Sequence, residues 1–285
     1  MKSLSEMTLP FCLQAAKRHR VVTSVLVLGA AALVADGSAH GQVSQMIAYL
    51  TGVVVCIIAI DAVLVFRTVP YEPLPVRHPR RELIVATILF LVAGVWLVGR
   101  YSSSYHPSRF FALVGLLGFL SVFQIALALF LLVSRYSPGD LGIRLSGFAP
   151  VPFVMVCFGV LAAFVSPLTL VWREVYREAG SVWNVVEIGV FAAALPEEFF
   201  RMVWQTRLSA WLNNRAVGWS LASLLWSLLH APQYGQGHNL ATTLYSVLSI
   251  IPYGLLLGYL TVRTQSILPS VLLHATKFLW AGLLG

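Results

Sequence analysis

The stretch AALPEEFFRMVW, residues 193–204, places two adjacent glutamates and an arginine in an otherwise apolar run. On a helix, residues three and four positions apart are neighbours, so Arg201 comes within reach of both Glu197 and Glu198. A charge inside a bilayer is costly, and it usually faces the protein interior and serves a function. The stretch therefore indicates either an ion pair that locks helices together or a reactive site.

The apolar surroundings of this stretch extend over the whole chain. Of the 285 residues, 58% are hydrophobic and 11% are charged, and the mean hydropathy is +0.82. Soluble domains carry about 25% charged residues. We therefore expect an all-α, polytopic bundle of about nine (eight to nine) transmembrane helices, each formed by roughly 20 mainly apolar residues. The expected spans are 21–36, 43–66, 83–99, 111–134, 150–171, 184–204, 216–230, 240–261 and 267–284.

Positive charge distinguishes the two sides of this bundle. With a cytoplasmic N-terminus, most of the 19 Lys and Arg residues fall in cytoplasmic segments, as the positive-inside rule requires. Lys17, Arg18 and Arg20 directly precede the first span, which we expect to remain as an uncleaved anchor. We expect an integral, multi-pass protein of the plasma membrane, the inner one if the source is bacterial. The net charge of +8 then marks the cytoplasmic face and indicates no nucleic acid partner.

Two loops rich in turn-forming residues divide the chain. The segment 67–82 is proline-rich and basic, and 134–150 contains Pro, Gly and Asp. We expect N-terminal transmembrane helices of unassigned role in 1–150 and a functional core in 151–285. The three cysteines are scattered, without a CxxC pair, and are expected to be small core residues: Cys12, Cys56 and Cys157.

Polar residues within the expected spans are the candidate functional groups. Asp61 stands alone among apolar neighbours. It is either a partner in helix packing or part of a polar path. Glu187 lies near the outer end of its helix and can reach the interface. Glu197 and Glu198 differ from these because they cluster with a cation.

Two histidines extend the cluster. The segment SLLWSLLHAPQ, residues 223–233, ends an apolar helix with His230. Glu197 and His230 lie at nearly equal sequence distances from a turn at 213–215, about 24–26 Å along each helix. Two antiparallel helices joined by this turn therefore bring them level. His274 falls about two turns into the final helix, one turn before Lys277.

A glutamate with two histidines suits two chemistries. One is a metal site, but the residues come from three helices and the chain has no HExxH motif. The other is a carboxylate base that activates water, with histidine sharing the proton or stabilising an oxyanion. We favour the second, and expect neither a metal nor another cofactor.

These residues together resemble the membrane-embedded CAAX protease and bacteriocin-processing (CPBP) family of intramembrane glutamate endopeptidases, over about residues 184–280. Family members carry two adjacent glutamates followed after three residues by arginine, then phenylalanine four positions before a histidine. A last histidine is followed four positions later by asparagine or a similar polar residue. The resemblance implies that Glu197, or Glu198 in its place, activates water together with His230. It implies that His274 helps to hold the oxyanion and that Arg201 organises the carboxylates.

Three positions differ from the family pattern. The arginine follows the glutamates one residue early, Trp226 replaces phenylalanine as a mild aromatic exchange, and Phe278 replaces an asparagine that would serve as an oxyanion donor. An endopeptidase is our first hypothesis, acting near the membrane surface on a peptide or protein, lipidated and membrane-anchored substrates included. The alternative is a non-catalytic membrane protein of the same fold, an immunity or processing partner.

A transporter or channel is the third hypothesis. Asp61, Glu187 and Glu197 would then line an ion path. Internal symmetry between the two halves of the chain would favour this function, and we find none.

Overall fold

A computed structural model describes residues 20–39, 41–66, 73–102, 109–156, 187–231 and 239–283. Every regular element within these ranges is a helix, which confirms the all-α prediction. The expected span 150–171 lies mostly outside the described residues, as do Cys12 and Cys157.

Two helical hairpins precede the core. The first comprises α2 (Arg20–Ala39) and α3 (Val43–Phe66), joined through Gly41, whose positive φ of 69° suits a residue without Cβ. The second comprises α4 (Pro79–Ser102) and α5 (Arg109–Ala128), which continues as the π-helix η1 (Leu129–Val133). A loop with the short 3₁₀-helix η2 (Gly139–Leu141) follows.

The glutamate stretch opens a helix that extends well beyond the expected span. The π-helix η3 (Glu187–Ala194) leads directly into α9 (Leu195–Trp211), which has Pro196 in its first turn. Asn213 adopts a positive φ of 47°, and the Asn214 side chain accepts a 3.1 Å hydrogen bond from the backbone N–H of Val217. That cap starts α10 (Arg215–Leu228), so the predicted turn between antiparallel helices is confirmed.

The expected span 240–261 contains a break. Helix α12 (Leu240–Ser249) ends at Ile250, and α13 (Ile251–Thr264) begins with Pro252 in its first turn. Proline has no N–H to continue the hydrogen-bond ladder of the preceding turn, which explains the interruption. Gln265, with a positive φ of 55°, ends α13, and α14 (Leu268–Leu283) follows.

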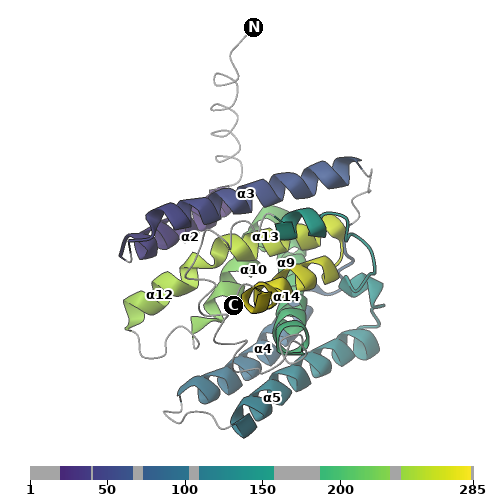
Figure 1. Ribbon diagram of the computed structural model, residues 1–285. Helices are drawn as coiled ribbons and strands as arrows, with labels where there is room; N and C mark the ends of the chain where they lie inside the picture. The colour runs from purple at the N-terminus through teal and green to yellow at the C-terminus, as the bar shows by residue number, and fades with distance from the viewer. Residues whose placement is uncertain are drawn as a thin grey trace.

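The two hairpins pack on different sides of the C-terminal helices (Figure 1). Helices α2 and α3 lie along α13, whereas α4 and α5 lie along α9. Phe199 and Phe200, which follow the two glutamates, join the buried core formed with α4 and α5, and the Phe123 and Phe199 rings are 5.3 Å apart. Helix α9 therefore presents aromatic side chains to this hairpin, while Glu197, Glu198 and Arg201 face α10, α13 and α14.

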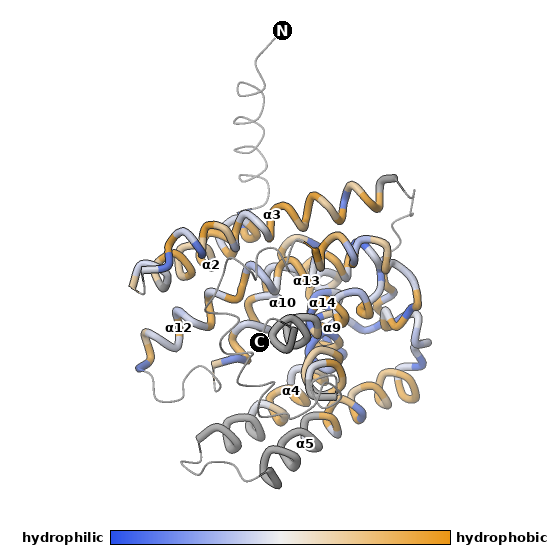
Figure 2. The backbone as a smooth tube through the Cα atoms, viewed as in Figure 1, coloured by the Kyte–Doolittle hydropathy of each residue, from blue (hydrophilic) through white to orange (hydrophobic). Residues whose placement is uncertain are grey.

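The polar residues gather where α9, α13 and α14 meet, whereas α3 is largely hydrophobic (Figure 2). Three helical segments of the described part of the chain are long and apolar enough to cross a membrane: Arg20–Ala39, Val43–Leu64 and Leu240–Thr264. A total of about nine transmembrane helices, the cytoplasmic N-terminus and the domain boundary at residue 150 stay predictions.

Candidate active site

The two adjacent glutamates occupy different environments. Glu198 is fully buried, and its Oε2 is paired with the guanidinium of Arg201. Its Oε1 lies 3.1 Å from Nδ1 of His274 on α14. Since a carboxylate only accepts hydrogen bonds, Nδ1 of His274 is the donor in this contact. Glu198 therefore links α9 to α14 and sets the orientation of the His274 ring.

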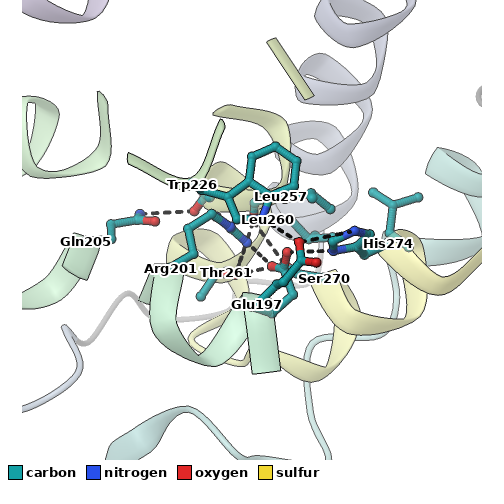
Figure 3. A network of polar contacts seen from close by, with 12 residues as sticks. Glu197, Arg201, Gln205, Trp226, Leu257, Leu260, Thr261, Ser270 and His274 are labelled. Carbon is teal, nitrogen blue, oxygen red and sulfur yellow. Dashed lines mark hydrogen bonds and ion pairs between the residues drawn. The ribbon is translucent and has the colours of Figure 1, made fainter. Parts of the chain in front are cut away.

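Glu197 is accessible, with 18% of its side chain exposed. Its Oε2 accepts a 2.8 Å hydrogen bond from the indole N–H of Trp226. The same oxygen lies 3.6 Å from Nε2 of His230 and 3.8 Å from Nε2 of His274. One carboxylate oxygen thus faces an indole and two imidazoles, and Figure 3 shows Glu197, Trp226 and His274 converging.

The contacts of His230 assign one of its ring protons. Nδ1 of His230 lies 3.1 Å from the backbone carbonyl oxygen of Trp226, one helical turn earlier. A carbonyl oxygen only accepts, so Nδ1 carries a proton, and the other ring nitrogen, Nε2, faces Glu197.

Arg201 is buried completely at the base of the site. Its Nη2 donates to Glu198 and lies 3.5 Å from the Thr261 hydroxyl oxygen, which is 2.8 Å from that of Ser270. A Cβ on Gly258 would lie 2.8 Å from Nη1 of Arg201, so a glycine lets α13 pass this close. Nε and Nη1 are buried with no hydrogen-bond partner among the described residues.

The structure therefore brings together the five residues predicted to form the active site: Glu197, Glu198, Arg201, His230 and His274. The equal depth expected for Glu197 and His230 is observed. The side chains of Glu187, Lys277 and Phe278 lie outside the described part of the structure.

Sequence reasoning missed several features of this site. It named Trp226 as the aromatic residue before His230 but not as a hydrogen-bond donor to Glu197. Thr261 and Ser270 line the buried ion pair, and the Tyr253 ring lies edge-on to His274 with centroids 6.0 Å apart. Little in the sequence marks Thr261, Ser270 and Tyr253 as site residues, because small hydroxyl residues and tyrosines are common in apolar helices.

A second buried polar network lies away from this site and joins α4 to α9. Arg207 donates to Oε2 of Glu82 at 2.8 Å, and the Tyr136 hydroxyl donates to Oε1 at 2.7 Å. Burial by itself would raise the pKa of Glu82. The hydrogen bond from Tyr136, the charge of Arg207 and the N–H of His78 outweigh burial, and the pKa of Glu82 is lowered.

Asp61, the isolated acid of the sequence, also has partners. Its carboxylate accepts hydrogen bonds from the Tyr259 hydroxyl at 2.5 Å and from Arg263 at 2.8 Å. These contacts tie α3 to α13. Asp61 is 44% exposed, so the pair lies at the rim of the helix interface.

A cavity of about 600 Å³ opens one turn along α9 from Arg201. The loop at 73–76 and helices α9, α10 and α13 surround it, and its lining includes Gln205, Thr261, Trp219 and Tyr259. Among the residues the structure describes, no group of three or more His, Cys, Asp and Glu side chains is arranged to hold a metal ion.

Comparison with protein families gives one result that bears on this site. Residues 178–277 match the family model "Type II CAAX prenyl endopeptidase Rce1-like". The match confirms the family resemblance seen in the motifs, and its bounds contain all five candidate site residues. No curated protein and no solved structure matches the chain.

Proposed function

We propose that this protein is an intramembrane endopeptidase in which Glu197 and His230 activate a water molecule. The match to a family of CAAX prenyl endopeptidases supports protease activity in general. The roles of the residues are those that the family resemblance implies, and the geometry of the site supports them.

The observation that carries the proposal is the contact between Glu197 and His230. Oε2 of Glu197 and Nε2 of His230 face each other at 3.6 Å. A water molecule bound beside this pair would be held by both side chains and would keep a lone pair on its oxygen for attack.

The reaction then proceeds as follows. Glu197 takes one proton from the water, and at the same time the water oxygen bonds to the carbonyl carbon of the scissile peptide. The carbonyl oxygen becomes an oxyanion, and the C–N bond breaks as the proton passes from Glu197 to the leaving nitrogen. General base catalysis of this kind contributes about 10²–10⁴-fold in rate.

His274 and Glu198 are proposed to act on the oxyanion. The Nδ1–H of His274 is donated to Glu198, so its Nε2 can donate to an oxyanion only when the ring carries both protons. The two negative charges of Glu197 and Glu198 are then balanced by the two positive charges of Arg201 and the protonated His274 ring. This pairing explains why two carboxylates, a guanidinium and an imidazole share one apolar site.

The substrate is proposed to be a peptide or protein held at the membrane, lipidated substrates included. The cavity beside Gln205 and Thr261 opens on the side of the 212–214 turn, which the arginine distribution places in the cytoplasm. Gln205, which lines this cavity, lies one helical turn along α9 from Arg201. We place the protein in the plasma membrane with a cytoplasmic N-terminus.

The test is a comparison of peptide termini in membranes from cells that express wild type or Glu197→Gln at equal levels. The glutamine can still accept from Trp226, so insertion and folding should be retained, whereas a carboxamide cannot accept a proton as a base. Termini found only with the wild-type protein are the expected result. Identical termini would overturn the proposal and favour a non-catalytic protein of the same fold.

A further inference from the structure

We propose that Trp226 is a positioning residue whose indole N–H holds the Glu197 carboxylate in its reactive orientation. This inference rests on the proposed function, because it assigns Trp226 a part in the same reaction. Its basis is the 2.8 Å hydrogen bond from Nε1 of Trp226 to Oε2 of Glu197.

Trp226 contacts three of the side chains to which we assign a part in the reaction, Glu197, His230 and His274. Besides the bond to Glu197, its ring lies edge-on to His230 with centroids 4.7 Å apart and to His274 with centroids 5.8 Å apart. Trp226 is 1% exposed, so its position is determined by packing. One rigid, buried ring therefore sets the relative placement of a carboxylate and two imidazoles.

The donor matters because the end of a glutamate side chain is loosely defined. The terminal torsion of Glu is broad, so a partly exposed carboxylate samples many orientations. A hydrogen bond to a charged oxygen is shorter and stronger than a neutral one, and it selects one orientation. In that orientation Oε2 faces Nε2 of His230. The phenylalanine typical of the family has no N–H and cannot perform this role.

The neighbouring helix provides room for the larger ring. A Cβ on Gly254 would lie 2.8 Å from Cε3 of Trp226 and 3.1 Å from Cζ3. Any larger residue at 254 would push the indole out of its place. Gly254 and Trp226 thus form a matched pair, which indicates that the site is built around an indole.

The test is a comparison of Trp226→Phe with Trp204→Phe. Both replace a buried tryptophan, since Trp226 is 1% and Trp204 is 2% exposed, but Nε1 of Trp204 has no hydrogen-bond partner among the described residues. Trp204 packs against Phe90 and lies outside both the site and the cavity. We expect Trp226→Phe to lower kcat by about 10- to 100-fold with little change in KM, because misplacing a catalytic group by about 1 Å costs rate on this scale. Trp204→Phe should leave kcat within a few-fold of wild type.

A wild-type kcat in folded Trp226→Phe would overturn the inference, and so would an equal fall in both variants. Absence of any cleavage by the wild-type protein would instead overturn the proposed function. Cleavage that is retained in Trp226→Phe removes only the positioning role, so the two failures are distinguishable.

A spectroscopic measurement tests the contact without any substrate and without a tryptophan variant. In protein labelled with ¹⁵N-tryptophan, we expect one indole N–H resonance of the wild type to move when Glu197→Ala removes the acceptor. The resonance should move less in Glu197→Gln, which keeps an acceptor oxygen. If no indole resonance moves in Glu197→Ala, the hydrogen bond and the inference are wrong.

Discussion

Oε1 of Glu198 lies 3.1 Å from Nδ1 of His274, although the two residues are 76 positions apart in the sequence. The preceding residue, Glu197, makes no such fixed pair with a histidine, and its Oε2 instead faces two Nε2 atoms at 3.6 and 3.8 Å. The two glutamates therefore differ in access and in partners. This difference supports Glu197 as the base and Glu198 as the residue that orients His274.

We expect Glu198→Gln to lower kcat by about 10²-fold or more while KM changes little. The neutral amide no longer balances a doubly protonated His274, so the oxyanion loses a donor, and losing one such donor costs about 10²–10³ in rate. Steady-state kinetics on a peptide identified from the termini measure this effect. Full activity of Glu198→Gln, with Glu197→Gln inactive, would show that Glu198 has no part in the reaction.

We expect Arg201→Ala to destabilise the protein by about 3–5 kcal/mol, because it leaves Glu198 buried without its cation. Thermal unfolding in detergent, followed by circular dichroism, measures the change in Tm. Arg201→Lys is the control, since it keeps the charge but not the forked geometry. Its Tm should lie between those of the wild type and Arg201→Ala. An unchanged Tm for Arg201→Ala would contradict the role assigned to this ion pair.

The stability of the protein should depend on Glu82 in acid. The pKa of Glu82 is lowered in the folded state, so its contribution is complete above the unfolded value of about 4.5 and is lost as the pH falls through the folded value. We expect Glu82→Gln to be less stable than wild type at neutral pH, with a difference that shrinks below about pH 4.5. The free energy of unfolding against pH tests this. A constant difference down to pH 3 would show that the ionisation of Glu82 is not involved.

We expect Asp61→Asn to cost no more than about 1 kcal/mol and to leave cleavage intact. Its partners Tyr259 and Arg263 hold α3 against α13, and the pair is partly exposed, where ion pairs contribute little. A double-mutant cycle with Arg263→Gln measures the coupling. Loss of activity in Asp61→Asn at unchanged stability would instead place this acid in a functional polar path.

We expect a metal chelator to leave cleavage unchanged. Oε1 of Glu198 and Nδ1 of His274 are directed at each other, and Nδ1 of His230 is directed at a backbone carbonyl, so the side chains are arranged as hydrogen-bonding pairs. Activity before and after dialysis against chelator tests this. Inhibition that added zinc reverses would make the site metal-dependent.

Much of the site could be predicted because helical spacing is a local property. Arg201 had to lie near Glu198 once both were on one helix, and the asparagines at 213 and 214 are typical of a turn followed by a helix cap. Two antiparallel helices joined there had to bring His230 level with Glu197. Apolar composition in turn required helices, since these satisfy their own backbone hydrogen bonds within lipid.

The sequence by itself therefore determined the helical class, the turn at 213–214 and the set of charged residues that share a buried site. Only the tertiary structure decided which glutamate binds His274, because that depends on how α14 rotates against α9, which no local rule sets. It also decided that Trp226 donates to Glu197, since this needs α13 to approach through Gly254. Packing between distant helices fixes orientation to within a fraction of an ångström, whereas sequence spacing fixes only which side of a helix a residue occupies.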